Sequence, residues 1–348
     1  MTDGYQGAVT ETKSAKGARR PAARASAGGQ SYLESLLDQG LLIDTGLEGV
    51  YGRSEAFEEV VDSVSALIGM WGLSHQAELL RFPPAMGRAT LEQSGYLANF
   101  PQLAGAVYSF CGGEAEHQRL LRCLDGGTDA GGQAWDGSQR PTRLAMTPVA
   151  CYPVYPVMAR RGPLPPEGRT LDIFSYCFRH EPSLAPERMQ LFRQREFVRM
   201  DKPAGVVAFR QEWMAHALDM FAALGLPAEI AVAHDPFFGR AGRVMADSQR
   251  NQQLKFELLV PGVNPERPIA CGSFNYHMDR FSSIWGILDA DGQIAHTGCC
   301  GFGLERVALS LFKWHGFEIR RWPAPVRRTL RNARRRRGAS ALNERAGV

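Results

Sequence analysis

Hydrophobic residues recur at helical spacing in several stretches of the chain. In Ala56–Trp71 the apolar positions fall three or four residues apart and acidic residues stand near the start, which predicts an amphipathic helix. Residues 215–224 predict a second helix, closed by Gly225 and Pro227. A third helix is predicted in GFGLERVALSLFKW, which begins with glycines and continues with an apolar face.

Short runs rich in β-branched and aromatic residues predict strands. They are LDIFSYCFRHE, EFVRM, EIAVAHD, KFELLVP, SIWGILDADG and the stretch before HTGCCGFG. SIWGILDADGQIAHTG predicts a hairpin that turns at Asp291 and Gly292. In RFPPAMGRATLEQSGY, Pro83 and Pro84 end any helix and start an extended segment. Successive strands with few helices between them predict an α+β fold, with a mostly antiparallel sheet flanked by helices.

Charge is distributed unevenly along the chain. Of the net charge of +4 over 348 residues, residues 1–30 carry +3 and residues 320–348 carry +9, which leaves −8 for residues 31–319. An acidic body argues against a broad nucleic-acid-binding face. We predict a disordered basic leader at 1–30, one folded domain at 31–320 and an Arg-rich disordered tail at 321–348. The run Arg334–Arg337 leaves open a contact with RNA or an acidic partner.

Apolar runs and cysteines bear on the cellular compartment. No apolar run reaches the about 18 residues that a membrane-spanning helix needs. The N-terminus lacks the apolar core of a secretory signal. Seven cysteines are an odd number, which suits free thiols or a metal site better than a disulfide framework. We therefore expect a cytoplasmic protein without a membrane partner.

Two segments carry residues suited to phosphates and nucleobases. In residues 178–197, Arg179 offers paired donors and a permanent charge for a phosphate, and Phe192 offers a ring face for a base. A plain hairpin with surface Arg/Glu pairs explains the same spacing. In residues 299–312, glycines admit a ligand close to the backbone, and Arg306 stands near a helix start. A structural glycine turn is equally consistent there.

The cysteines give no metal signal by spacing. Cys151 and Cys299 lie too far apart in the sequence for a local zinc finger. A buried cysteine that packs as a small apolar residue is the ordinary case for each of them. Cys177 and Cys271 are likewise expected to pack in the core.

Together these segments resemble a known family. FRHE and LFRQREF, followed by GFGLERVALSLF, resemble motifs 2 and 3 of class II aminoacyl-tRNA synthetases, and RFPPAMGRATLEQSGY resembles the dimer-forming motif 1. Over residues 45–320 the chain resembles the amino acid:[carrier protein] ligases, which are bacterial relatives of the catalytic core of archaeal, zinc-dependent seryl-tRNA synthetases. The segments that carry this resemblance are TPVACYPVYP, FRHEPS, RMQLFRQREF, HDPFFGRAGR, FNYHMD and HTGCCGFGLER. It implies a class II catalytic domain at 31–320 and a homodimer.

The resemblance also implies a metal site. Cys151, Glu196 and Cys299 match the positions that hold one zinc ion per subunit in the family, with Cys300 as a rival for Cys299. Three protein ligands leave one position of a tetrahedral ion open, and the resemblance assigns that position to the substrate α-amine. Thiolate ligands favour zinc over magnesium at such a site.

An ATP site with Mg²⁺ is implied by the same resemblance. Arg179 matches the residue that binds the α-phosphate, and Arg306 matches the one that binds the γ-phosphate. Phe192 is expected to stack on adenine and Glu181 to contact its edge. Glu257 and Ser273 lie where the family places ligands associated with Mg²⁺. The residues that the resemblance implies for ATP binding are therefore Arg179, Glu181, Phe192, Glu257, Ser273 and Arg306.

The implied reaction has two steps. A small amino acid, glycine or alanine, is activated by ATP as an aminoacyl-adenylate, and the phosphopantetheine thiol of an acyl carrier protein then takes the aminoacyl group. The alternatives are a seryl-type synthetase that charges tRNA and a non-catalytic paralogue. Because no extended heptad pattern of a tRNA-binding arm is present, we do not expect tRNA as a partner. Arg179 and Arg306 are both in place, which argues against the paralogue.

The carrier protein requires a docking surface. Carrier proteins are typically acidic around the attachment serine, and HDPFFGRAGRVMADSQRNQ supplies Arg240, Arg243 and Arg250 on a predicted loop and helix. We predict that these arginines dock the carrier protein. The alternative is an ordinary solvated helix face.

Overall fold

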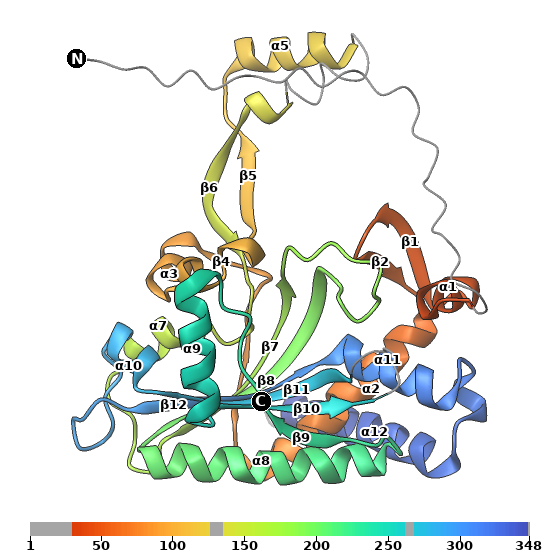
Figure 1. Cartoon of the computed structure of the whole chain (residues 1–348), viewed down its shortest axis with the longest axis vertical. Coiled ribbons are helices and arrows are strands. Elements are labelled where there is room, and N and C mark those ends of the chain that lie inside the picture. The colour runs from red at the N-terminus through yellow and green to blue at the C-terminus, as the bar shows by residue number, and fades with distance from the viewer. Residues whose placement is uncertain (1–29, 126–134, 262–267, 347–348) are drawn as a thin grey trace. The chain divides into compact units, whose positions relative to one another are not determined.

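A seven-stranded sheet forms the centre of the computed structural model, which describes residues 30–125, 135–261 and 268–346 (Figure 1). Neighbouring strands pair antiparallel except β3 with β7, which are parallel. This arrangement confirms the predicted α+β fold with a mostly antiparallel sheet. In spatial order the strands are β3 (Glu78–Arg81), β7 (Arg169–Phe178), β8 (Leu191–Asp201), β12 (His296–Gly303), β11 (Ile269–Met278), β10 (Lys255–Val260) and β9 (Glu229–Val232).

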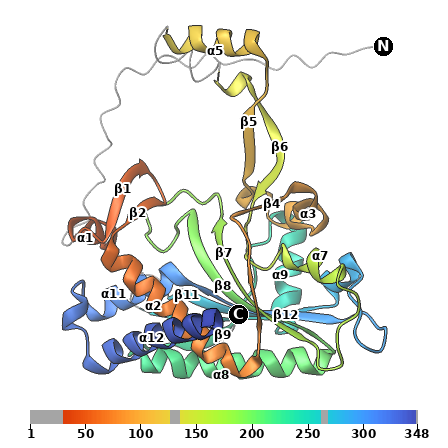
Figure 2. The same cartoon turned by 180° about the vertical axis from the view of Figure 1, so that it is seen from behind.

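Helices pack on one another against one face of the sheet (Figure 2). Helix α2 begins where the Ser54 side chain accepts a hydrogen bond from the backbone N–H of Phe57, with Glu55 and Glu58 in its first turn. Both features favour a helix start, because they satisfy a free N–H group and complement the helix dipole. The helices of this layer are α2 (Glu55–Trp71), α8 (Pro203–Ala223), α11 (Leu304–His315) and α12 (Ala324–Ala346).

Alternate residues of β12 enter two separate hydrophobic cores. Cys300 and Phe302 belong to the core that also contains Phe57 of α2 and Trp213 of α8. Cys299 belongs to the second core. Because successive side chains of a strand point to opposite faces, the two adjacent thiols lie on opposite sides of the sheet.

Smaller elements complete the described part of the chain. Among the described residues, every helix is too short or too polar to cross a membrane. A three-stranded sheet has the order β4-β6-β5, and β1 pairs with β2. These elements are α1 (Tyr32–Asp38), β1 (Leu42–Leu47), β2 (Val50–Arg53), η1 (Gly72–His75), β4 (Ala85–Gly87), α3 (Arg88–Gln93), α4 (Tyr96–Asn99), η2 (Pro101–Leu103), β5 (Ala106–Phe110), α5 (Glu114–Asp125), β6 (Gln139–Met146), α7 (Val154–Ala159), α9 (Gly239–Asn251), α10 (Arg280–Trp285) and η3 (Ile319–Arg321).

The prediction of a hairpin around Asp291 is wrong for its first strand. Arg280–Trp285 forms helix α10, which ends at Gly286 with φ of 71°. Only an isolated bridge between Leu288 and Ile294 spans the turn among the described residues. The aromatic rings of this helix stack on Tyr155, so tertiary packing outweighs the local strand preference.

Two other boundaries differ from the sequence prediction. The helix predicted at 215–224 begins earlier, at Pro203, a residue that suits the first helical position. A strand was expected in the stretch before HTGCCGFG. Instead, the residues of HTGCCGFG form strand β12. Glycines are depleted in strands, so their abundance in this segment concealed its strand character.

The prediction of a disordered tail at 321–348 is wrong for the residues that the structure describes. Helix α12 covers most of this segment, and its Val326, Leu330 and Ala333 are buried in the core against α2. Their spacing of four and three residues is an apolar helix stripe, which the surrounding arginines concealed. Arg334 also pairs with Glu59 of α2 at 2.7 Å. The leader predicted at 1–30 lies outside the described residues, apart from Gln30.

Candidate active site

A cavity of about 740 Å³ brings together the residues predicted for the zinc and ATP sites. Strands β8, β10, β11 and β12 each contribute to its lining, together with the segments before α7 and around α9. Residues far apart in the sequence therefore share one chamber. Those that were predicted from the sequence and line it are Cys151, Arg179, Glu181, Phe192, Glu196, Glu257, Ser273, Cys299 and Arg306.

Cys151, Glu196 and Cys299 form a compact buried cluster in this cavity. Their ligand atoms all lie within 4.8 Å of one another, and the three residues are 1%, 2% and 4% exposed. Cys151 precedes α7, Glu196 lies on β8 and Cys299 on β12. Glu196 is directly opposite Gly301 in the β8–β12 ladder, so Cys299 is its diagonal neighbour on the same face. Cys300 faces the other core and is excluded from the cluster.

The electrostatics of this cluster suit a bound cation. Burial and the neighbouring Cys299 raise the pKa of Glu196 to about 8. Burial and the hydrogen bond to Cys299 raise the pKa of Cys151, whereas the Cys151 thiol and His277 lower the pKa of Cys299. Among the described residues, Oε2 of Glu196 is buried without a hydrogen-bond partner. Two sulfurs and a carboxylate with an unpaired oxygen fit the donor set of a zinc ion.

Two further residues beside the cysteines were not predicted from the sequence. The Asn275 side-chain amide donates to Sγ of Cys299 at 3.3 Å, and Nε2 of His277 lies 3.6 Å from the same sulfur. Both are on β11, two residues apart, so they point to the same face. Their segment FNYHMD carried the family resemblance, and its alternation was the available signal. Hydrogen bonds from residues of this kind fix the orientation of a metal-binding side chain.

Arg179 and Arg306 both line the cavity. Nε of Arg179 donates to the carbonyl of Pro148 at 3.2 Å, and Nε of Arg306 donates to the carbonyl of Glu187 at 2.9 Å. Within the described ranges, no carboxylate lies at ion-pair distance from either guanidinium. Burial and the charge of Arg179 lower the pKa of Arg306. In the described part of the chain, the side-chain hydrogen bonds of both guanidinium groups go to backbone carbonyls, and such cations in a cavity are suited to an anionic ligand.

Arg179 has an aromatic ring and a carboxylate near it in the cavity. Its guanidinium lies 5.3 Å from the centre of the Phe192 ring, which also lines the cavity. Glu181 lies 3.7 Å from Arg188, so its carboxylate is partly engaged. An aromatic face, a cation and a carboxylate thus line the same chamber, and these groups suit a phosphate and a base.

Glu257 and Ser273 are cross-strand partners in the β10–β11 ladder. Lys255 binds the Glu257 carboxylate at 3.0 Å and the Asp235 carboxylate at 2.6 Å. Burial raises the pKa of Asp235, but Lys255, the Gln249 side chain and Arg179 together lower it below its usual value, so this carboxylate stays charged. Glu257 therefore belongs to a network of ion pairs with Lys255 and Asp235, and Ser273 lies opposite it. Lys255 and Asp235 were not predicted from the sequence.

Arg240 and Arg243 lie outside the lining of the cavity, on α9. Both are exposed, and Val244, which directly follows Arg243, is 69% exposed. Met245 and Gln249 of the same helix line the cavity. Helix α9 thus forms part of the cavity wall with one face and presents arginines on another, on the opposite side of the sheet from α8 (Figure 1).

Sequence relatives were found over most of the chain. Amino acid--[acyl-carrier-protein] ligase 1 of Bradyrhizobium diazoefficiens is 46% identical over 301 residues, which are 86% of this chain and 89% of that protein. Ligase 2 of the same organism is 45% identical over 312 residues, 90% of this chain and 91% of that protein. Type-2 serine--tRNA ligase of Methanopyrus kandleri is 28% identical over 202 residues, 54% of this chain and 38% of that protein. The chain matches no family model.

Solved structures share the fold. M. kandleri SerRS, in complex with A. aeolicus tRNASec, superposes with a TM-score of 0.73 at 20% identity, over 90% of this chain and 62% of that chain. Seryl-tRNA synthetase from Pyrococcus horikoshii, complexed with ATP, gives 0.60 at 12% identity, over 82% of this chain and 59% of that chain. These similarities establish the class II aminoacyl-tRNA synthetase fold. With nearly half of the residues shared along most of both sequences, the chain belongs to the amino acid--[acyl-carrier-protein] ligases.

Proposed function

We propose that this ligase activates glycine or alanine with ATP and transfers the aminoacyl group to the phosphopantetheine thiol of a carrier protein. One observation carries the proposal: a single cavity contains both a buried Cys–Glu–Cys cluster and two arginines that have no carboxylate partner among the described residues. The first group suits an amine-binding metal, and the second suits the phosphates of a nucleotide. Their shared chamber allows the carboxylate of the amino acid to meet the α-phosphate.

The amino acid end of the cavity would be organised by the cysteine cluster. Cys151, Glu196 and Cys299 would hold a zinc ion, which when bound supplies an open position for the deprotonated α-amine. Asn275 and His277 position the Cys299 sulfur through the contacts at 3.3 Å and 3.6 Å. These residues together fix where the substrate carboxylate lies relative to the nucleotide.

At the nucleotide end, the two arginines act on the phosphates of ATP bound with Mg²⁺. The substrate carboxylate oxygen forms a bond to the α-phosphorus, and the bond from that phosphorus to the pyrophosphate oxygen breaks. Arg179 would stabilise the charge that develops on the α-phosphate, and Arg306 the charge on the γ-phosphate. Phe192 would stack on adenine and Glu181 would contact its edge, with Glu257 and Ser273 near the Mg²⁺.

The second step requires no nucleophile from the chain. The phosphopantetheine thiol gives its proton to solvent, the thiolate attacks the carbonyl carbon of the mixed anhydride, a thioester forms, and AMP leaves with the electrons of the broken carbon–oxygen bond. Thiolates are strong nucleophiles, so the enzyme has only to position the incoming thiol. A homodimer is proposed from the likeness of the segment around Pro83 and Pro84 to the dimer-forming motif.

A small substrate is favoured by the aromatic groups beside the cluster. The His277 ring lies against Cys299 and packs edge-on against Phe281, with centroids 5.0 Å apart. Phe281 in turn stacks on Tyr155 at 4.3 Å, and this ring system is fixed by its packing. Packed rings therefore line part of the space next to the cysteines, and we propose that they restrict the substrate to a small side chain, hydrogen or methyl. One methyl group accounts for about 1–3 kcal/mol of discrimination, so both amino acids remain in the proposal.

The proposed function is tested by measuring which amino acids support ATP–pyrophosphate exchange. We expect exchange with zinc-loaded enzyme and glycine or alanine, because adenylate formation is reversible. Mass spectrometry of a pantetheinylated carrier protein, incubated with enzyme, ATP and the active amino acid, should show the added aminoacyl mass. No exchange with any of the twenty amino acids contradicts the proposal. Transfer to tRNA in place of the carrier protein would support the seryl-type synthetase instead.

The docking of the carrier protein is tested by reversing two charges on α9. We expect Arg240→Glu combined with Arg243→Glu to slow aminoacyl transfer at least about tenfold while exchange stays unchanged, because charge pairs steer association. The matched control is Arg320→Glu with Arg321→Glu, which changes the net charge equally at two exposed positions of η3. An equal loss of exchange and transfer in the α9 variant, or an equal slowing in the control, counts against docking at α9.

A further inference from the structure

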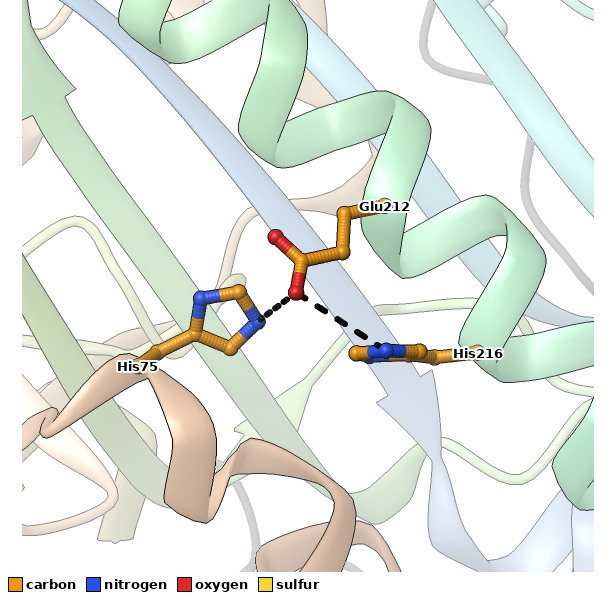
Figure 3. A group of neighbouring side chains, drawn as sticks. All are labelled: His75, Glu212 and His216. Atoms are coloured by element: carbon orange, nitrogen blue, oxygen red, sulfur yellow. Dashed lines mark ion pairs between the residues drawn. The ribbon is translucent and has the colours of Figure 1, made fainter.

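Two histidines and a glutamate meet on the helical side of the molecule. His75 ends the short helix η1, which joins α2 to β3, and Glu212 and His216 lie one turn apart on α8. Figure 3 shows the Glu212 carboxylate between the two imidazole rings. None of these three residues lines the proposed catalytic cavity.

The distances within this triad are compatible with three ligands of one ion. Oε1 of Glu212 lies 3.8 Å from Nε2 of His75 and 3.8 Å from Nε2 of His216, and all three ligand atoms lie within 4.8 Å of one another. A distance of 3.8 Å is too long for a hydrogen bond. Two ligands of one tetrahedral zinc, each about 2.0–2.1 Å from it, are about 3.4 Å apart. Small side-chain rotations therefore bring the triad to coordination distance.

Aromatic packing holds both imidazoles in this orientation. The His75 ring stacks on Trp213, with centroids 5.5 Å apart and planes at 18°, and the His216 ring lies 5.3 Å from Trp71. In the described part of the chain, Nε2 of His75 and Nδ1 of His216 are buried without a hydrogen-bond partner. An unpaired buried nitrogen is unfavourable, and a ligand that binds Nε2 of His75 removes that cost.

We propose that His75, Glu212 and His216 bind a divalent transition-metal ion, separately from the cysteine cluster. Two imidazoles and one carboxylate favour zinc and its neighbours in the transition series over Mg²⁺ or Ca²⁺. The His75 side chain is 10% exposed, whereas those of His216 and Glu212 are 23% and 49% exposed, so water has access to complete the coordination. The ion would tie the segment between α2 and β3 to helix α8.

Cobalt(II) distinguishes the two metal sites in one titration. Co²⁺ bound by thiolates gives a charge-transfer band in the near ultraviolet, whereas a site of nitrogen and oxygen ligands gives only visible bands. We expect metal-free protein to bind two Co²⁺ ions per chain, and only one of them to produce the thiolate band. If the cysteine cluster takes no metal, one ion without the thiolate band still supports the triad.

Variants of the triad locate the second ion. Glu212→Gln and His216→Gln should each weaken binding at the thiolate-free site at least about tenfold and leave the thiolate band unchanged. The control is His117→Gln, which replaces an exposed histidine of α5 and should retain both ions. Circular dichroism of the metal-free variants checks folding, and Glu212, being half exposed, is the substitution that disturbs packing least. A wild-type chain that binds no thiolate-free ion, or variants that bind it as tightly as wild type does, overturns the proposal.

Discussion

Replacing Cys299 by alanine should remove the bound zinc and lower amino-acid-dependent exchange by about 10³-fold, because the α-amine loses the group that orients it. Cys299 is one of three proposed ligands whose atoms lie within 4.8 Å, and its sulfur also accepts the Asn275 hydrogen bond. Without it, Cys151 and Glu196 remain as a buried thiol and carboxyl that hold a cation weakly. Zinc content by elemental analysis and exchange with saturating amino acid measure the two effects.

The adjacent thiol provides the matched control. Cys300→Ala removes the same atom from the next position of β12, but that side chain is in the opposite core. We expect this variant to retain zinc and exchange, with a modest loss of thermal stability from the small cavity that it leaves. Full activity in Cys299→Ala, or loss of zinc in Cys300→Ala, would show that the wrong face of the strand was assigned.

Replacing Arg179 by alanine is the second change with a large expected effect, a fall in the rate of adenylate formation of about 10²–10³-fold. The guanidinium is held by the carbonyl of Pro148 and by the face of Phe192, and within the described residues it has no acid partner. Its charge is therefore available for the α-phosphate, where negative charge develops in the transition state. Single-turnover formation of the adenylate at saturating ATP and amino acid measures this effect.

A lysine at position 179 separates charge from geometry. Arg179→Lys keeps the charge but lacks the planar fork, so we expect a smaller loss than for alanine. Because the proposed interaction strengthens in the transition state, the rate at saturating ATP should fall in both variants. A rise confined to KM for ATP, with the maximal rate unchanged, would mean that Arg179 only binds the ground state.

Much of the sheet was predictable, because its strands are local patterns. The runs around Cys177 and Phe197 alternate or are continuously apolar, and they form β7 and β8 as predicted. The failures occurred where distant packing outweighs local preference. Arg280–Trp285 becomes a helix because its rings stack on Tyr155, and α12 forms because Val326 and Leu330 pack against α2.

The candidate site was predictable in part, for a similar reason. Arg179 and Arg306 were recognisable because each belongs to a continuous motif. Asp235 and Lys255 were missed because their ion pair at 2.6 Å joins separate segments. His277 was missed because its role depends on its distance from Cys299, which no spacing along the chain encodes.

By itself, the sequence determined the class of fold, the family resemblance and the chemical types of the residues that could act, since these depend on composition, periodicity and continuous motifs. Tertiary structure alone decided which groups meet. It separated Cys299 from Cys300, because neighbouring side chains of a strand point to opposite faces. It also brought His75 to Glu212 and His216, because the end of η1 packs against α8. Convergence in space depends on the register and packing of whole elements, and these are properties of the folded chain.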